Sequence, residues 1–231
     1  MKILVIVPAY NEALNIEKTI KDLQKNAKEC DYVIINDCSK DNTKEVCEKN
    51  HFHTISLPIN YGLTSGIQIG MKYAKQKGYD IAIQFDGDGQ HSAKYIKDLV
   101  KEIKNKNCDI AVGSRFVTEK KPKSLRMLGS NILQLAIKMV TGKTLKDPTS
   151  GMRAYNKKAI DEFVTNSSLT PEPDTIVYMI KKQMKVKEVQ VEMSDREYGE
   201  SYLNAFKSIE YMLSMMFSII FVRAFTKKGG K

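Results

Sequence analysis

The feature that most constrains the fold is a series of short, almost wholly apolar segments separated by stretches with helical periodicity. Residues 3–7, 32–35 and 81–85 are such apolar runs, and between them apolar residues recur at helical spacing, as over 16–23 and 67–74. Continuous apolar runs are typical of strands buried on both faces of a sheet. Strands that alternate with helices form parallel crossover units. The sequence therefore predicts an α/β fold: an open, mostly parallel sheet flanked by helices.

The strand at 81–85 runs directly into two carboxylates, Asp86 and Asp88, separated by one glycine. Strand alternation places both at the carboxyl end of the strand, where open α/β sheets bind ligands. Carboxylates this close repel each other unless a cation neutralises them, and oxygen ligands suit Mg²⁺ or Mn²⁺. We predict a metal site at Asp86 and Asp88 that takes a phosphate-bearing ligand, with His91 beside the diphosphate. The alternative is a plain acidic turn, because Asp-Gly pairs are strong turn formers.

Two further polar loops follow predicted strands. Pro8 ends the first strand and opens the loop 8–12, and the loop 36–41 follows the second strand. The carboxyl ends of parallel strands meet at one edge of a sheet, so both loops converge with Asp86 and Asp88 on a single site. His51 and His53 share a face at the start of another strand, where exposed histidines are commoner than a metal pair.

Composition narrows the partners. A chain of 231 residues fits one well-packed domain with a small appendage, and its net charge of +10 favours anionic partners. Nucleic acid is disfavoured because the basic segments lack interleaved aromatic residues. The four cysteines show no metal-binding spacing, which indicates the reduced thiols of a cytosolic protein.

The second half of the chain is basic. Residues 118–146 hold seven basic side chains against one acid, Glu119, and include a predicted helix at 124–140. This stretch fits either an anion-binding flank or a solvated helix face. A turn-rich loop at 147–153 follows, then a helix at 174–184 and a half-exposed strand at 186–193.

The C-terminal segment is apolar and ends in a basic cluster. Met212–Val222 is eleven residues of nearly unbroken apolar character, too short for the roughly 20 that a membrane span needs. Arg223 and three lysines follow it. An apolar helix with a cationic end suits an anionic membrane surface, and it suits equally a core helix or a homo-oligomer interface. We predict a catalytic domain at 1–205 and an amphipathic helix with a tail at 206–231.

Taken together and in this order, the polar loops resemble those of the family 2 inverting glycosyltransferases of the GT-A fold, in particular the dolichol- and polyprenyl-phosphate sugar synthases. The resemblance covers nearly the whole chain to Leu203. The matching segments are Pro8-Ala-Tyr-Asn-Glu12, Asp37 with Ser39 and Thr43, Asp86-Gly-Asp-Gly-Gln90, Gly113-Ser-Arg115, Ser150-Gly-Met-Arg153 and Asp195-Arg-Glu-Tyr-Gly-Glu-Ser201.

The resemblance implies a nucleotide-diphosphate sugar as donor and a divalent metal, Mg²⁺ or Mn²⁺. It implies nucleotide-binding roles that begin in the first loop and end on an arginine. The residues concerned are Pro8, Tyr10, Glu12, Asp37, Asp86 and Arg115. The resemblance places Asp86, Asp88 and Gln90 at the metal, with Asp88 as the ligand most directly tied to catalysis. On chemical grounds Arg115, Arg126 and Arg153 are candidates to grip phosphate oxygens of the nucleotide in bidentate fashion, and each fits a surface salt bridge as well.

The acceptor decides whether a base is needed. A polyprenyl phosphate presents an oxygen that is already anionic, and a peripheral enzyme on the cytoplasmic face of the membrane would meet it there. A saccharide hydroxyl needs a carboxylate to take its proton, for which Asp147, Glu172 and Asp174 are candidates, although Asp174 also fits a helix cap. A third alternative is a nucleotide-sugar binder without turnover. Its only hint is Asn36, where many relatives carry an aspartate.

Overall fold

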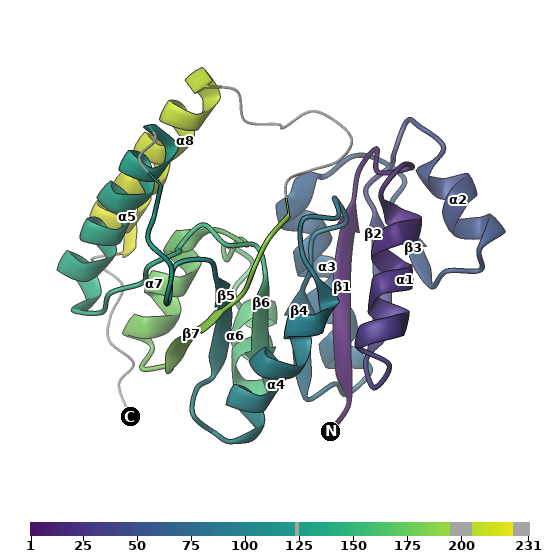
Figure 1. The fold of residues 1–231 in the computed structure, drawn as a ribbon, viewed down its shortest axis with the longest axis horizontal. Helices are drawn as coiled ribbons and strands as arrows, with labels where there is room; N and C mark the ends of the chain where they lie inside the picture. The colour runs from purple at the N-terminus through teal and green to yellow at the C-terminus, as the bar shows by residue number, and fades with distance from the viewer. Residues whose placement is uncertain (123–124, 195–204, 224–231) are drawn as a thin grey trace.

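The computed structural model describes residues 1–122, 125–194 and 205–223, and its centre is one seven-stranded sheet (Figure 1). The strands are β1 (Ile3–Ala9), β2 (Asp31–Asn36), β3 (Thr54–Ser56), β4 (Ile81–Gln84), β5 (Ile110–Ser114), β6 (Arg153–Asn156) and β7 (Val186–Gln190). Their order is β3-β2-β1-β4-β6-β5-β7, and every pairing is parallel except those of β6 with β4 and β5. The predicted open, mostly parallel sheet is confirmed.

Helices cover both faces of the sheet. One face packs against α1 (Ile16–Asn26), α2 (Thr43–Lys49), the 3₁₀ turn η1 (Ala93–Tyr95) and α4 (Ile96–Lys104). On the other face α3 (Gly62–Gln76) and α6 (Lys157–Thr165) lie against the strands. The helices α5 (Leu125–Thr141), α7 (Pro173–Lys181) and α8 (Ala205–Phe217) and the π-helical turn η2 (Ser218–Arg223) pack against one another and join the same core cluster. Because both faces are covered, the central strands are apolar throughout, which explains their continuous runs in the sequence.

The strand β6 and the helix α6 were not predicted. The loop expected at 147–153 ends at Arg153, which opens β6 between β4 and β5. The four residues of β6 include only two apolar ones, too few to show a period. Asn156 then caps α6 by accepting the Ala159 N–H at 3.0 Å. This inserted antiparallel strand separates the fourth and fifth strands, which the sequence order alone would have made neighbours.

Several predicted boundaries shift. Pro8 does not end β1 but lies inside it, opposite Ile35 of β2. The pairing of β1 with β4 stops at Ile6, so beyond that residue β1 has one paired neighbour, the situation in which a strand tolerates proline. The helix expected to reach residue 184 ends at Lys181, and the strand expected to reach 193 ends at Gln190.

The C-terminal helix belongs to the domain core. α8 lies beside α5 (Figure 1), and Ile219 of η2 is fully buried in the core cluster on that face. The two helices approach closely at Gly129, where a Cβ would lie 2.7 Å from the Met212 Cε. Among the described side chains of this segment, Met212, Met215, Met216, Ile219 and Ile220 pack into the core cluster on that face of the sheet. The side chain of Arg223 and residues 227–231, which make up the basic cluster, lie outside the described residues.

Candidate functional site

The first two polar loops lie together at the carboxyl edge of the sheet and are tied to each other. The Asn11 N–H donates to the Ser39 hydroxyl at 3.0 Å, and the Lys40 N–H donates to the Asn11 side chain at 2.8 Å. The Glu12 N–H donates to the Thr43 hydroxyl at 2.9 Å. Asn11 has a φ of 56°, a left-handed conformation that asparagine tolerates better than most residues. The polar residues of both loops thus build a cross-linked rim.

Asp37 has a structural partner in addition to its predicted role at the nucleotide base. Its two carboxylate oxygens accept the N–H groups of Tyr61 and Gly62, each at 2.7 Å, where α3 begins. Gly62 has a φ of +80°, which favours glycine there. Asn36 holds the same loop, since its side-chain oxygen accepts the Ser39 hydroxyl at 2.6 Å. Asn36 therefore has a structural role in the loop that follows β2.

The other residues expected at the nucleotide differ in exposure. Tyr10 is 41% exposed, and Glu12 is 8% exposed with its carboxylate accepting the Asn15 amide at 2.7 Å. Glu12 therefore also fixes the start of α1. The backbone carbonyl of Pro8 lies close to Gly87 in the loop that follows β4. All three residues lie at the carboxyl end of β1 or in the loop that follows it.

Asp86 and Asp88 emerge at the same edge, directly after β4. Two glycines let the backbone pack closely around them. A Cβ on Gly87 would lie 2.9 Å from the Pro8 carbonyl oxygen, and a Cβ on Gly151 would lie 2.2 Å from the Asp86 Oδ2. The Asp86 carboxylate therefore lies directly against the loop that precedes β6.

The turn after Asp86 is held by its own side chains. The Asp88 Oδ1 accepts the Gln90 N–H at 3.1 Å, so the predicted acidic turn exists alongside any ligand role. The His91 Nδ1 accepts the Asp86 N–H at 3.2 Å, and its Nε2 lies 3.8 Å from the Asp86 Oδ2. His91 is 8% exposed and packs edge-on against Phe85. The His91 ring therefore holds both the backbone and the carboxylate of Asp86 in place.

The donor set fits a hard divalent cation whose shell is completed by a ligand. Asp86, Asp88 and Gln90 are all partly exposed and offer oxygen donors. Mg²⁺ is usually held by one or two carboxylates together with substrate phosphates. Within the described part of the chain, no group of three or more His, Cys, Asp or Glu side chains is placed to hold a metal without such help.

Arg115 and Asp147 form a bidentate ion pair beside this edge. The Arg115 Nε and Nη2 donate to the two Asp147 oxygens at 2.7 and 2.8 Å. Asp147 is fully buried, and its hydrogen bond raises the pKa of the Arg115 guanidinium. Both Asp147 oxygens are engaged, so the carboxylate predicted as a base instead orients an arginine.

Arg153 is buried beneath the edge and not presented on it. Only 1% of its surface is exposed, and its guanidinium donates to three backbone carbonyls. The Nε donates to Ser150 at 2.8 Å, Nη2 to Pro148 at 3.0 Å and Nη1 to Glu172 at 3.2 Å. These contacts brace the loop before β6, whereas the sequence suggested a grip on phosphate.

The two remaining acids lie under the C-terminal helix. Tyr211 of α8 donates a short hydrogen bond to the Glu172 carboxylate, and Ser218 of η2 donates to the Asp174 Oδ2 at 2.8 Å. The cap of α7 is Glu172 and not Asp174, which lies in the first turn. Sequence analysis missed Tyr211 and Ser218. Their spacing of seven, two helical turns in an apolar helix, is the signal that marks them as facing one partner.

Part of the predicted site lies outside the described structure. This applies to the side chain of Arg126 and to the segment 195–201, the last of the resembling motifs. Of the three predicted arginines, the structure describes the side chains of Arg115 and Arg153.

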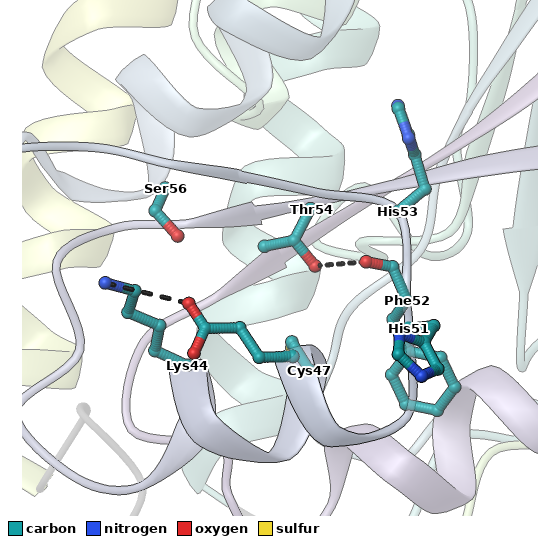
Figure 2. Close-up of a pocket in the computed structure, with 8 residues that line it drawn as sticks. Lys44, Cys47, His51, Phe52, His53, Thr54 and Ser56 are labelled. Atoms are coloured by element: carbon teal, nitrogen blue, oxygen red, sulfur yellow. Dashed lines mark hydrogen bonds and ion pairs between the residues drawn. The ribbon is translucent and has the colours of Figure 1, made fainter.

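His51 and His53, which lie between α2 and β3, do not come together. His51 has a φ of 54° after α2, and the His53 Nε2 lies 3.1 Å from the Tyr73 hydroxyl. Figure 2 shows their rings pointing apart across a pocket of about 550 Å³ between α2 and β3. Lys44 and Glu48, 3.7 Å apart, form an ion pair at its rim. This pocket contains none of the predicted site residues.

The fold and the edge define a class of protein. A mostly parallel sheet with a carboxylate pair at its carboxyl edge is the architecture of a GT-A glycosyltransferase. Solved structures share it: glucosyl-3-phosphoglycerate synthase from Mycobacterium tuberculosis superposes with a TM-score of 0.69 at 15% identity, over 95% of this chain and 80% of that one. The same enzyme has been solved with Mn²⁺ and UDP-glucose, with a TM-score of 0.68.

The chain belongs to glycosyl transferase family 2, whose profile matches residues 4–164. Its relatives include a dolichol-phosphate mannosyltransferase of Pyrococcus furiosus, 31% identical over 92% of this chain and 62% of that protein. An undecaprenyl-phosphate mannosyltransferase of Micrococcus luteus is 27% identical over 88% of each chain. The predicted glycosyltransferase class is thereby confirmed.

Proposed function

We propose that this glycosyltransferase moves a sugar from a nucleotide-diphosphate sugar to a polyprenyl phosphate at a membrane surface. Relatives that match nearly their full length act on such lipids. One is the UDP-N-acetylglucosamine–dolichyl-phosphate N-acetylglucosaminyltransferase of Methanococcus voltae, which is 28% identical over 93% of this chain and 95% of that protein. The base and the sugar of the donor are left to experiment.

The single observation that supports a phosphate acceptor is that each of the three candidate bases already has a side-chain partner. Asp147 is paired with Arg115, Glu172 accepts the Tyr211 hydroxyl, and Asp174 accepts Ser218. A general base needs a carboxylate oxygen within hydrogen-bond reach of the proton that it takes, and each of these three carboxylates is turned to a side chain of the protein instead. A lipid phosphate attacks with an oxygen that is already anionic, so it needs no base. This arrangement supports a phosphate acceptor over a saccharide hydroxyl.

On the donor side, the rim formed by the first two loops would bind the nucleoside, with Tyr10 exposed beside it and Asp37 at its back. Asp86, Asp88 and Gln90 would hold Mg²⁺ or Mn²⁺, which supplies Lewis-acid neutralisation of the departing diphosphate. Arg115, fixed by Asp147, offers its remaining N–H donors to phosphate oxygens. These chain residues bind and orient the two phosphate groups.

The surface that would meet the membrane is formed by two adjacent helices. We call it the α5–α8 apolar face; its exposed residues are Leu128, Ile132, Leu135, Met139, Leu213, Phe217 and Phe221. Lys138 and Lys143 are exposed nearby. Apolar area with adjacent lysines suits an anionic lipid surface, with each lysine worth about 1 kcal/mol. None of the described helices is long and apolar enough to span a bilayer. Peripheral attachment on the cytoplasmic side is therefore proposed.

The test is a panel of nucleotide sugars assayed with Mg²⁺ or Mn²⁺, with and without undecaprenyl or dolichyl phosphate. We expect lipid-dependent release of nucleotide and loss of activity in excess chelator. Asp88→Ala should abolish transfer with the fold intact. Asp98→Ala, at an exposed acid of α4, is the matched control.

Each other outcome points to one alternative. Transfer to a sugar hydroxyl without lipid phosphate would favour glycan assembly. Binding of a nucleotide sugar without turnover would favour a binding protein. Full activity of Asp88→Ala, or in chelator, would contradict the metal-dependent mechanism.

A further inference from the structure

The side of α8 and η2 that faces the domain carries two hydroxyl groups among apolar side chains. Tyr211 donates to Glu172 and Ser218 donates to Asp174, the carboxylates that open α7. Asp174 is 5% exposed. Burial of Tyr211, together with the charge of Glu172, raises the pKa of its phenol, so it remains a hydrogen-bond donor throughout the physiological range. Both acids thus receive a hydrogen bond from the C-terminal helix.

The start of α7 is linked to the carboxyl edge of the sheet through Arg153. The backbone carbonyl of Glu172 accepts the Arg153 Nη1 at 3.2 Å. The other two arms of this guanidinium hold the carbonyls of Ser150 and Pro148 at 2.8 and 3.0 Å. Because guanidinium is planar and rigid, fixing one arm constrains the other two. The position of Glu172 therefore constrains the loop 148–151.

That loop contacts the candidate metal site directly. Gly151 lies so close to Asp86 that an added Cβ would be 2.2 Å from its Oδ2. A continuous series of contacts therefore runs from Tyr211 through Glu172 and Arg153 to Asp86. It connects α8, α7, β6 and β4, four elements far apart in the sequence.

We propose that Tyr211 and Ser218 are positioning residues, which dock the C-terminal helix on α7 and thereby order the loop that shapes the Asp86 site. The catalytic consequence rests on the proposed function; the ordering of the loop does not. Hydrophobic contacts, such as those of Ile219 in η2, hold the C-terminal segment on the domain, but such contacts do not depend on direction. The hydrogen bonds from Tyr211 and Ser218 to the two carboxylates are directional and fix the register of the helix.

The test compares Tyr211→Phe with Ser214→Ala, which removes an exposed hydroxyl from the same helix. Phenylalanine keeps the packing of the ring and removes only the donor. Hydrogen exchange followed by mass spectrometry should show the amides of 147–153 exchanging about tenfold faster in Tyr211→Phe, and unchanged in Ser214→Ala. The kcat for transfer should fall about tenfold, and the KM for lipid phosphate should stay within twofold.

A second pair of variants guards against simple misfolding. Ser218→Ala should show the same two effects, and Ser218→Thr, which keeps a hydroxyl, should restore both. If either substitution unfolds the protein, the other set carries the same comparison.

The outcomes separate the two proposals. Faster exchange of 147–153 in an enzyme that transfers no sugar would refute the proposed function and leave the positioning role intact. Wild-type transfer together with unchanged exchange and unchanged kcat in Tyr211→Phe and Ser218→Ala would overturn the positioning role.

Discussion

Gly151 shows at the scale of one residue why the loop before β6 needs a glycine. Its position leaves no room for a Cβ, because that atom would lie 2.2 Å from the Asp86 Oδ2. The colliding atom is the end of a side chain, so the carboxylate would move and the backbone would stay. Gly66 of α3 differs, since a Cβ there would meet its nearest atoms at 3.7 and 3.8 Å, ordinary contact distances.

We therefore expect Gly151→Ala to fold normally and to lose about 100-fold in kcat, the order of cost for a misplacement of about 1 Å at a catalytic group. Gly66→Ala is the control and should retain activity. The measurements are thermal unfolding and steady-state transfer. Normal kcat in Gly151→Ala would mean that Asp86 need not hold its observed position.

The structure gives Arg153 a different role from the one that the sequence suggested. Lysine keeps the charge but cannot serve three carbonyls from one ammonium. Two lost charge-assisted bonds at a buried site should lower the free energy of unfolding by about 3–6 kcal/mol, since each is worth about 1.5–3 kcal/mol. Urea denaturation of Arg153→Lys measures this, with exposed Lys158→Arg as the reverse control. Unchanged stability with weaker nucleotide binding would instead restore the phosphate-gripping role.

At the scale of elements, α5 and α8 carry apolar residues on the side away from the domain as well as toward it. Phe217 is 61% exposed and Leu135 is 57% exposed. The rings of Phe217 and Phe221 lie 4.9 Å apart and form the aromatic part of the α5–α8 apolar face. An exposed cluster of this kind marks an interaction surface.

Phe217→Glu should weaken cosedimentation with anionic vesicles by tenfold or more, because it places a charge on the face that enters the lipid interface. Gln76→Glu makes the same charge change at an exposed position at the end of α3 and should bind as wild type. Binding should also weaken with salt. If Phe217→Glu binds normally but changes the oligomeric state, the face is an interface between copies of this chain.

At the scale of the whole molecule, the C-terminal helix contributes to the same core as the sheet. Ile219 is fully buried, and Met212, Met215, Met216 and Ile220 pack against the core as partly buried residues. A fully buried isoleucine is worth about 1.5–3 kcal/mol. Removal of 206–231 should therefore lower stability by on the order of 5 kcal/mol and the midpoint of thermal unfolding by about 10 °C or more. An unchanged midpoint would show that the helix is an independent appendage.

The sequence by itself determined the buried strands, the helices between them and the edge at which the polar loops meet. Those features follow from local periodicity and from the geometry of parallel crossovers, so Asp37, Asp86 and Asp88 were placed correctly relative to the sheet. The partners of the charged residues could not be read from the sequence, because they come from distant segments. Arg115 meets Asp147 only because β6 enters the sheet beside β5, and Arg153 reaches Glu172 only because α7 follows. An arginine that grips phosphate and one that braces a buried loop look alike in a sequence. Burial and the atoms within reach of the guanidinium distinguish them, and both are properties of the tertiary structure.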